Sequence, residues 1–330
     1  MSRITVLGAG AWGTALALSL ARRTGHDLVL WCHSPALAEQ LTDIGENLPY
    51  LPGFTLPVDI LVTSDLPGAI FEADIILCVI PSQHLRKIIS HIAPLLTPDQ
   101  IVLSASKGIE ETSFLRMSQV IASVTDNPIA VLSGPSFAQE VAAGSPTALV
   151  AAAADPIIRQ TIQREFSSPS LRVYTNDDTA GVELGGALKN VVALATGAVH
   201  GLNLGHNSEA AVITRGIAEI TRLAIACGGR RQTLAGLSGL GDLVLTCTGN
   251  LSRNRSVGIE LGRGRQLDDI LHGLHGKVAE GVASTTAALG LAARYGVEMP
   301  ITEQVNAILH HSKSPKDAIR DLMARPGRDE

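Results

Sequence analysis

Lys189 is the residue of this chain whose type and setting point most directly to chemistry. It stands in an otherwise apolar stretch, and Gly185, Gly186 and Ala187 lie within one helical turn before it. An amine in such surroundings either reaches out to solvent or lies in a polar site, where desolvation makes it a usable general acid or base. Because the small neighbours let a ligand or another backbone approach closely, we favour proton transfer over a solvated lysine.

Asp242 adds a carboxylate to the candidate site. The run Ser252–Asn254 adds three polar side chains of the kind that bind anions. Asp242 lies among small apolar residues in the Gly-rich segment Gly236–Leu243, and it is a candidate partner that orients Lys189 or binds a substrate hydroxyl. The run Ser252–Asn254 places a hydroxyl, a guanidinium and an amide at a predicted helix start, a combination that suits a phosphate. The alternative for this run is an N-capped surface helix with exposed arginines.

Lys107 is a second candidate cation. It follows a predicted strand end in Ser106-Lys107-Gly108. A cation at the end of a buried strand can hold a phosphate or polarise a carbonyl group. The alternative is a lysine of a solvated loop.

A glycine-rich turn near the start of the chain predicts a bound dinucleotide. The apolar residues Ile4–Leu7 run into Gly8-Ala9-Gly10-Ala11-Trp12-Gly13, and a helical stretch, Thr14–Ala21, follows. Gly8 permits the tight turn, Gly10 lets the backbone approach a pyrophosphate, and Gly13 lets helix and strand pack closely. A strand before and a helix after this pattern favour binding over a Gly-rich turn of an ordinary βαβ unit.

The elements that must position these residues alternate in the first half of the chain. Short apolar strands are predicted at Leu28–Trp31, Ala73–Ile80, Ile101–Leu103, Ile129–Leu132, Thr147–Ala153 and Leu171–Thr175. Strands of this kind, separated by helical patterns, imply a parallel sheet covered on both faces. Several of them end in small or polar residues, and such strand ends form the ligand crevice of doubly wound sheets.

The second half of the chain has a helical period instead. From about Thr179 onward the apolar residues recur at helical spacing. Further helices are predicted at Ser208–Cys227, Ser256–Leu261, Leu267–Leu271, Thr285–Tyr295, Ile301–His310 and Pro315–Ala324. We therefore expect two domains, residues 1–179 and 180–330, in an α/β protein whose N-terminal doubly wound sheet precedes an all-α domain.

Composition excludes several classes of protein. With 45% hydrophobic and 17% charged residues, the 330-residue chain can bury a sizeable core, and its net charge of −5 gives no electrostatic case for nucleic acid or an anionic membrane surface. The four cysteines form no C-x-x-C pair, so we expect free thiols in a reducing compartment. We expect no signal peptide before the first strand and no apolar run of about 18 residues. Val191–Val199 is the most apolar piece. We expect a cytoplasmic protein without a membrane span, and we assign no residue to a metal.

The end of the second strand bears on the choice of coenzyme. NAD-specific folds commonly carry Asp or Glu there, to bind the ribose 2′-hydroxyl. This strand ends in Trp31-Cys32-His33-Ser34, without a carboxylate. Since His33 and Ser34 can donate to a 2′-phosphate, we favour NADPH over NADH, with use of both coenzymes as the alternative.

Six segments, taken together, resemble the bacterial NAD(P)-dependent sn-glycerol-3-phosphate dehydrogenases. They follow that family's order over nearly the whole chain: GAGAWGTALA (8–17), ASKGIE (105–110), LSGPSFAQEV (132–141), ELGGALKNVVALATG (183–197), GLGDLVLTCTGNLSRNRSVG (239–258) and VAEGV (278–282). The GDLVLTC…SRNR and GALKN parts are specific to that family.

The resemblance implies a Rossmann domain followed by a domain similar to the C-terminal part of 6-phosphogluconate dehydrogenase. It implies reversible hydride transfer between NAD(P)H and dihydroxyacetone phosphate, which yields sn-glycerol 3-phosphate for phospholipid synthesis. Lys189, helped by Asp242, would accept the proton in alcohol oxidation and donate it in ketone reduction, in a cleft between the domains. The implied substrate ligands are Lys107, Gly134, Ser136, Lys189, Asp242, Ser252, Arg253 and Asn254. The expected coenzyme ligands are Gly8, Gly10, Trp12, Gly13, His33, Tyr50, Lys107, Ala138, Arg253, Val278 and Glu280.

Two departures and two rival functions accompany the resemblance. Many family members carry Ser where this chain has Ala11 and Arg where it has His33, so we do not carry over the serine contact or a strong 2′-phosphate clamp.

One rival function is that of another two-domain hydroxyacid dehydrogenase, in which a K-x-x-N arrangement is expected; here Lys189 and Asn190 are adjacent. The other is a non-catalytic NAD(P)H redox sensor, for which the polar set around Lys189 has no purpose. A homodimer is an expectation from such enzymes in general, not from these residues.

Overall fold

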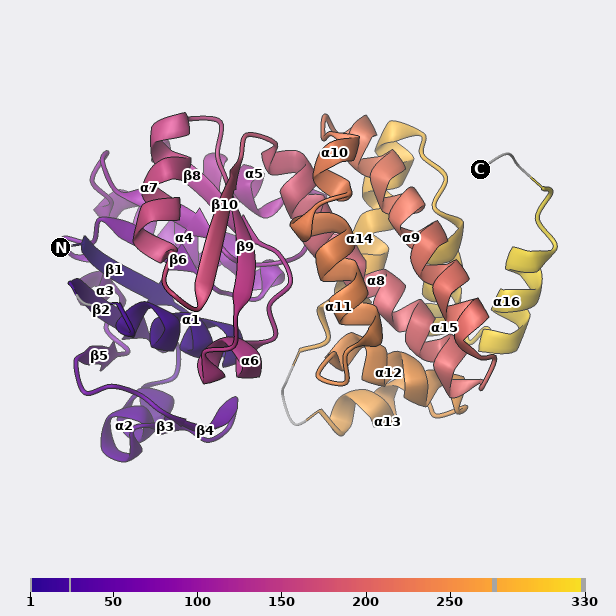
Figure 1. Ribbon diagram of the computed structural model, residues 1–330, viewed down its shortest axis with the longest axis horizontal. Helices are drawn as coiled ribbons and strands as arrows, with labels where there is room; N and C mark the ends of the chain where they lie inside the picture. Colours follow the sequence, from indigo (N-terminus) through magenta and orange to yellow (C-terminus); the bar gives the residue numbers. More distant parts are fainter. Residues whose placement is uncertain (1, 24, 275–277, 328–330) are drawn as a thin grey trace. The chain divides into compact units, whose positions relative to one another are not determined.

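The computed structural model describes residues 2–23, 25–274 and 278–327 (Figure 1). The chain divides into two compact units. Unit 1 comprises residues 1–107 and 115–183, and unit 2 comprises residues 108–114 and 184–330. The change of unit at residue 183 falls within the first turns of helix α8, Thr179–Gly201.

Unit 1 is built on an eight-stranded sheet of order β10-β9-β8-β7-β6-β1-β2-β5. Its strands are β1 (Ser2–Leu7), β2 (His26–Trp31), β5 (Ile60–Thr63), β6 (Ile75–Cys78), β7 (Ile101–Ser104), β8 (Ile129–Ser133), β9 (Thr147–Ala152) and β10 (Leu171–Asn176). A separate hairpin joins β3 (Glu46–Asn47) to β4 (Leu51–Thr55). All the strands predicted from the sequence are present, whereas β5 and the hairpin were not predicted.

The predicted parallel sheet is confirmed except at one pairing, which is antiparallel. Strands β5, β2, β1, β6, β7 and β8 pair in parallel, but β8 and β9 pair antiparallel, and β10 then runs parallel to β9. The connection from β8 to β9 contains only the six-residue helix α6 (Ala138–Ala143), and the chain re-enters the sheet from the edge at which it left. The apolar run of β9 predicts a buried strand but not its direction, because burial on both faces is the same for either.

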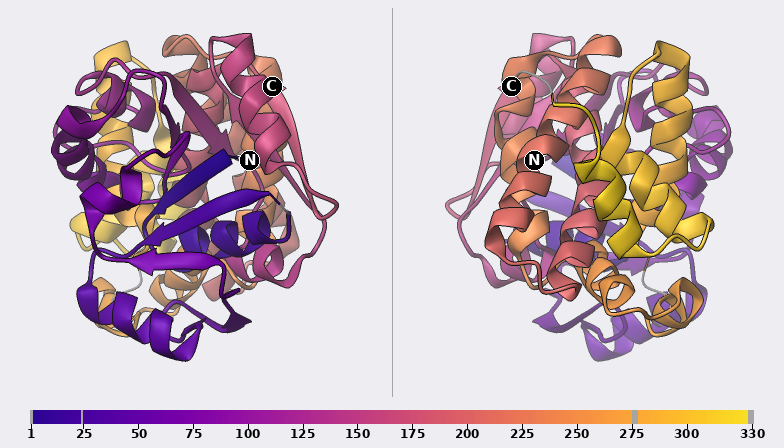
Figure 2. Two further views of the ribbon diagram at one scale, coloured as in Figure 1. Left: turned by 90° about the vertical axis from the view of Figure 1, so that its left-hand side faces the viewer. Right: turned by 90° about the vertical axis from the view of Figure 1, so that its right-hand side faces the viewer.

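Helices cover both faces of this sheet. One buried cluster contains Leu16, Val141 and Ile162 of α1, α6 and α7, and another contains Ala69, Leu85 and Val120 of α3, α4 and α5. The helices of unit 1 are α1 (Ala11–Ala21), α2 (Pro35–Ile44), α3 (Leu66–Ile70), α4 (Ser82–Ile92), the 3₁₀ turn η1 (Ala93–Leu95), α5 (Met117–Ala122), α6 and α7 (Pro156–Phe166). In the left-hand view of Figure 2 the successive strands of the sheet are rotated relative to one another, which is the usual twist.

Unit 2 is helical, as the period of its apolar residues predicts. Its elements are α8, α9 (His206–Ala226), α10 (Arg231–Leu234), the π-helical turn η2 (Leu237–Gly241), α11 (Asp242–Thr248), α12 (Arg253–Gly262), α13 (Leu267–His272), α14 (Glu280–Tyr295), α15 (Pro300–His310) and α16 (Pro315–Met323). Helices α10 and α11 and the π-turn were not predicted, because each is too short to show a period. Helix α16 lies beside α15 (Figure 2).

Helix α8 is the core of unit 2. Leu188 and Val192 belong to one buried cluster with residues of α9, α11 and α14, while Val191 and Leu194 belong to another with residues of α12 and α15. By length and composition α8 could cross a membrane, contrary to the expectation that no apolar run is long enough, but 94% of its most apolar 18-residue window is buried inside the protein. Core burial therefore accounts for its apolar character.

Candidate active site

The carboxyl ends of the parallel strands bring four predicted site residues to one edge of the sheet in unit 1. Gly8 follows β1, His33 lies just after β2, Lys107 lies after β7, and Gly134 directly follows β8. These four strands run in the same direction, so their carboxyl ends meet at the same edge. Ligands of doubly wound sheets bind along this edge.

The turn after β1 leaves no room for side chains at two of its glycines and leaves open space at the third. Gly8 has a φ of +118°, and a Cβ there would lie 2.5 Å from the carbonyl oxygen of Val79. A Cβ at Gly13 would overlap the carbonyl oxygen of Gly8. At Gly10 a Cβ would meet nothing within 4 Å. Gly8 and Gly13 are therefore required by the fold of the turn, whereas Gly10 borders free space.

Asn47, which the sequence analysis did not single out, holds this turn in place. It is fully buried, and its Nδ2 donates to the carbonyl oxygen of Ala9 at 2.9 Å and to Oγ1 of Thr14 at 2.7 Å. The residue comes from β3, far along the chain from the turn. No local pattern marks it, because its partners become neighbours only in the folded unit.

The residues at this turn fit a dinucleotide. Helix α1 begins after Gly10, which has no side chain to cap the first free N–H groups of the helix. Nε1 of Trp12, in the first turn, is buried without a hydrogen-bond partner among the described residues. An anion such as a pyrophosphate satisfies free amides at a helix N-terminus. The open space at Gly10 and the unsatisfied donor of Trp12 are what a bound coenzyme would fill.

The remaining coenzyme candidates of unit 1 lie at loops and helix starts. His33 is exposed, and its ring stands edge-on to that of Trp31, with centroids 5.8 Å apart. Ser34 caps α2, since its Oγ accepts from the amide of Leu37 at 3.3 Å. Tyr50 is partly exposed in the β3–β4 hairpin, and Ala138 is the first residue of α6.

Lys107, Gly134 and Ser136 form a small polar cluster in unit 1. Nζ of Lys107 and Oγ of Ser136 each donate to the carbonyl oxygen of Gly134 at 3.0 Å. Both side chains are half-buried. The structure therefore brings together the three substrate ligands that the resemblance implies for the first half of the chain.

Lys189 and Asp242 form a buried ion pair in unit 2. Nζ of Lys189, on α8, donates to Oδ1 of Asp242, the first residue of α11. Lys189 is 7% exposed and Asp242 is fully buried. The hydrogen bond to this buried carboxylate fixes the direction of the lysine's donors. The pair can thus hold a proton ready for transfer.

The π-turn η2 packs directly against α8 and places Asp242, the residue that follows it, next to that helix. A Cβ at Gly185 of α8 would overlap the carbonyl oxygen of Ser238 in the turn, so the glycine lets the two backbones touch. Single π-turns occur often at functional sites because they redirect the chain within a helix. Cys247, also on α11, is buried close to the pair, and desolvation raises the pKa of its thiol to about 12, so it stays neutral.

Helix α12 presents the predicted phosphate-binding run. Ser252 is its N-cap, with Oγ accepting from the amide of Arg255 at 3.2 Å, and Oδ1 of buried Asn254 accepts from the amide of Gly281 at 2.9 Å. Arg253 keeps exposed surface, although the surrounding protein lowers the pKa of its guanidinium by desolvation, against the charge of Glu280. The helix start is thus N-capped, which agrees with the alternative of an ordinary surface helix. It also carries a partly desolvated cation, which agrees with a phosphate site.

Facing glycines fix the depth at which α12 packs on α8. A Cβ at Gly197 of α8 would overlap the carbonyl oxygen of Arg255, and a Cβ at Gly258 of α12 would overlap that of Leu194. The two backbones therefore touch where the helices cross. This contact sets the start of α12 relative to the helix that carries Lys189.

Val278 and Glu280 complete the predicted set in unit 2. Val278 is 44% exposed, and Glu280 is the first residue of α14. The predicted site residues thus fall into two groups, one in each unit.

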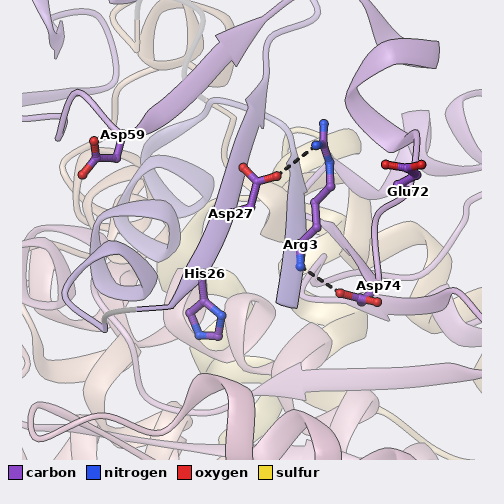
Figure 3. Close-up of a pocket in the computed structure, with 6 residues that line it drawn as sticks. All are labelled: Arg3, His26, Asp27, Asp59, Glu72 and Asp74. Carbon is purple, nitrogen blue, oxygen red and sulfur yellow. Dashed lines mark hydrogen bonds and ion pairs between the residues drawn. The ribbon is translucent and has the colours of Figure 1, made fainter. Parts of the chain in front are cut away.

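A hollow of about 640 Å³ in unit 1 lies at the opposite edge of the sheet, at the amino ends of the strands (Figure 3). Four carboxylates, Arg3 and His26 line it. Arg3 uses its Nη1 for Asp27 at 2.9 Å and its amide for Asp74 at 2.8 Å. In Figure 3 the ring of His26 points away from Asp59 and Glu72. None of the predicted site residues reaches this hollow.

Comparisons with known proteins agree over nearly the whole chain. Residues 3–158 match the family model described as NAD-dependent glycerol-3-phosphate dehydrogenase N-terminus, and residues 178–320 match the model of the C-terminus of the same family. Glycerol-3-phosphate dehydrogenase [NAD(P)+] of Acidobacterium capsulatum is 61% identical to this chain and that of Koribacter versatilis is 55% identical. The matches cover all of this chain and 100% and 99% of those two proteins.

Solved structures give the same result. The crystal structure of glycerol-3-phosphate dehydrogenase from Coxiella burnetii is 39% identical, with a TM-score of 0.94 over 98% of this chain and 99% of that one. A ketopantoate reductase of the PanE/ApbA family from Ralstonia eutropha, 17% identical with a TM-score of 0.64, shares the fold.

Proposed function

This chain belongs to the NAD-dependent glycerol-3-phosphate dehydrogenase family, and from that membership we propose that it reversibly transfers a hydride between NAD(P)H and dihydroxyacetone phosphate to give sn-glycerol 3-phosphate. The single structural observation that carries the chemistry is the buried Lys189–Asp242 pair. A ketone becomes an alcohol only if a proton reaches the oxygen as the carbon is reduced. An ammonium group held in a desolvated place by a carboxylate supplies that proton.

Lys189 is the proton donor of the proposed reaction. Its Nζ gives a proton to the oxygen on C2 of dihydroxyacetone phosphate as negative charge develops there, and it takes the proton back in the reverse direction. Asp242 keeps Nζ charged and directed. The nicotinamide coenzyme supplies or accepts the hydride when it is bound.

The substrate phosphate is assigned to the start of α12. Ser252, Arg253 and Asn254 supply a hydroxyl, a guanidinium and an amide there, and the free amides of the first helical turn add to them. Holding the phosphate fixes C2 relative to Nζ of Lys189. In unit 1 we assign substrate contacts to Lys107, Gly134 and Ser136, whose polar groups already converge.

The coenzyme is assigned to the turn after β1 and to the residues named with it. Gly8, Gly10, Trp12 and Gly13 hold the pyrophosphate region, and the other assigned contacts are His33, Tyr50, Lys107, Ala138, Arg253, Val278 and Glu280. We propose that NADPH is preferred over NADH, because β2 is followed by His33 and not by a carboxylate.

We place the enzyme in the cytoplasm, in the supply of glycerol 3-phosphate for phospholipid synthesis. All four cysteines are free, as the sequence analysis predicted and as a reducing compartment requires. A homodimer is part of the proposal and is tested by light scattering of the purified protein.

The deciding experiment is the oxidation of NADPH by dihydroxyacetone phosphate, followed by the absorbance of the reduced nicotinamide. We expect turnover with this substrate and none with 3-hydroxyacids or 6-phosphogluconate in the reverse direction. Turnover with one of the latter two would favour a different hydroxyacid dehydrogenase. Binding of NADPH without turnover of any of them would favour the redox sensor.

A further inference from the structure

Gly281, at the second position of α14, is the meeting point of three helices of unit 2. Its amide donates to Oδ1 of Asn254 on α12 at 2.9 Å. A Cβ at Gly281 would lie 2.8 Å from that same oxygen and 2.8 Å from the carbonyl oxygen of Asn190 on α8. Gly281 is buried and helical, so it is the space and not the backbone angle that requires a glycine.

The bond to Gly281 fixes which way round the amide of Asn254 lies. Only the carbonyl oxygen of an asparagine side chain can accept from a backbone N–H, so Oδ1 must face Gly281. Nδ2 is attached to the same carbon, and it therefore points away from Gly281. A phosphate accepts hydrogen bonds and repels a carbonyl oxygen, so it can use Asn254 only in this orientation.

The neighbours of these residues tie the arrangement to the reaction. Asn190 directly follows Lys189, and Glu280 directly precedes Gly281. Glu280 also lies close enough to Arg253 for its charge to act on the guanidinium. One glycine thus adjoins the residue that follows the proton donor, the phosphate-binding helix and a residue assigned to the coenzyme.

We propose that Gly281 is a positioning residue of the dehydrogenase: it orients the amide of Asn254 toward the substrate phosphate and sets the distance between α12, α14 and the Lys189 region of α8. This role rests on the proposed function. In this proposal Oδ1 of Asn254 accepts from the amide of Gly281 and stabilises the fold, while Nδ2 donates to the substrate phosphate.

The first test compares Gly281→Ala with Gly290→Ala in the full-length protein. Both replace a glycine within α14, and a Cβ at Gly290 would overlap the ring of Phe114, away from Asn254. Loss of one hydrogen bond to a charged ligand weakens binding about tenfold or more. We expect G281A to raise KM for dihydroxyacetone phosphate about tenfold, with a smaller change in kcat. G290A should lower Tm and leave KM unchanged.

A double-mutant cycle shows whether Gly281 acts through Asn254. If it does, G281A should raise KM much less in an Asn254→Ala background than in the wild type. Fully additive effects, or equal KM values for G281A and wild type, overturn the proposal and leave the dehydrogenase activity standing. Absence of turnover by the wild type overturns the proposed function and this role with it.

Asn254→Asp provides an independent test should G281A fail to fold. A carboxylate still accepts from the amide of Gly281, but it has no donor and repels the phosphate. Tm should therefore stay close to wild type in N254D and fall in N254A, whereas KM should rise most in N254D. A fall of Tm in N254D as large as that in N254A would contradict the two separate tasks of this amide.

Discussion

Two regions of the molecule differ in what forms the candidate site. One is the turn in unit 1 that carries coenzyme candidates, and the other is the Lys189 region of unit 2. The turn is a run of contiguous residues, Gly8–Gly13, whose main chain and missing side chains shape the site. The Lys189 region takes single side chains from α8, α11 and α12, and each is buried or paired by another element. Substitution in the first region should act through shape, whereas substitution in the second should act through charge and protons.

Lys189→Ala should have the largest effect of any single change. Removing a general acid lowers kcat by about 10²- to 10⁴-fold. The affinity for NADPH, measured by fluorescence titration, should change little, because Lys189 is not among the residues assigned to the coenzyme. Breaking a buried ion pair also destabilises a protein by about 3–5 kcal/mol, so a lower Tm should accompany the loss of turnover.

Lys313→Ala is the matched control for this prediction. Lys313 also pairs with a carboxylate in unit 2, Asp321, but both side chains are partly exposed. Exposed pairs contribute at most about 1 kcal/mol, so K313A should keep its Tm within a few degrees and its kcat unchanged. Near-normal turnover by K189A would remove Lys189 from the chemistry.

Arg253→Ala should act on binding and leave the chemical step nearly unchanged. A charge-assisted hydrogen bond to a phosphate is worth about 1.5–3 kcal/mol, which corresponds to a rise of KM for dihydroxyacetone phosphate of about 10- to 100-fold. Initial rates at varied substrate separate KM from kcat. Arg263, just after the other end of α12, pairs with Glu260 and is exposed, so R263A should behave as wild type. An unaltered KM in R253A would contradict the phosphate assignment.

The sequence predicted the two regions to different depths, for a physical reason. The turn Gly8–Gly13 is local, so its pattern alone showed the strand, the helix and the space for a ligand. The candidate pairing of Lys189 with Asp242 was also foreseen, because both are lone charges among apolar residues. Asn47 and Gly281 were missed, since each has its effect through atoms that are distant along the chain.

The same distinction applies to the fold. Long periodic segments such as α9 and α15 were predicted within a few residues of their observed ends. The π-turn η2, on which the position of Asp242 depends, has no period to detect and was missed. The predicted direction of β9 was wrong, because the apolar sequence of a strand buried on both faces is the same for a parallel and an antiparallel strand.

Gly10→Ala and Gly13→Ala separate space for a ligand from space for the fold. A Cβ at Gly10 meets no protein atom within 4 Å, so G10A should keep the wild-type Tm and raise KM for NADPH about tenfold by filling the ligand's space. A Cβ at Gly13 overlaps the carbonyl oxygen of Gly8, so G13A should lower stability by about 1–3 kcal/mol. Equal Tm values in the two variants, or an unchanged KM for NADPH in G10A, would refute this division.

His33→Arg should have the smallest effect. It tests whether position 33 in unit 1 contributes to the choice between NADPH and NADH. NADPH and NADH differ only in the 2′-phosphate, and a guanidinium can form two parallel hydrogen bonds to a phosphate, which an imidazole cannot. The ratio of kcat/KM for NADPH to that for NADH should therefore rise about three- to tenfold, through NADPH alone. Added salt should reduce this gain, because an exposed charge is screened. If H33R instead improved both coenzymes equally, position 33 would act on a part that they share, and the preference for NADPH would need another origin.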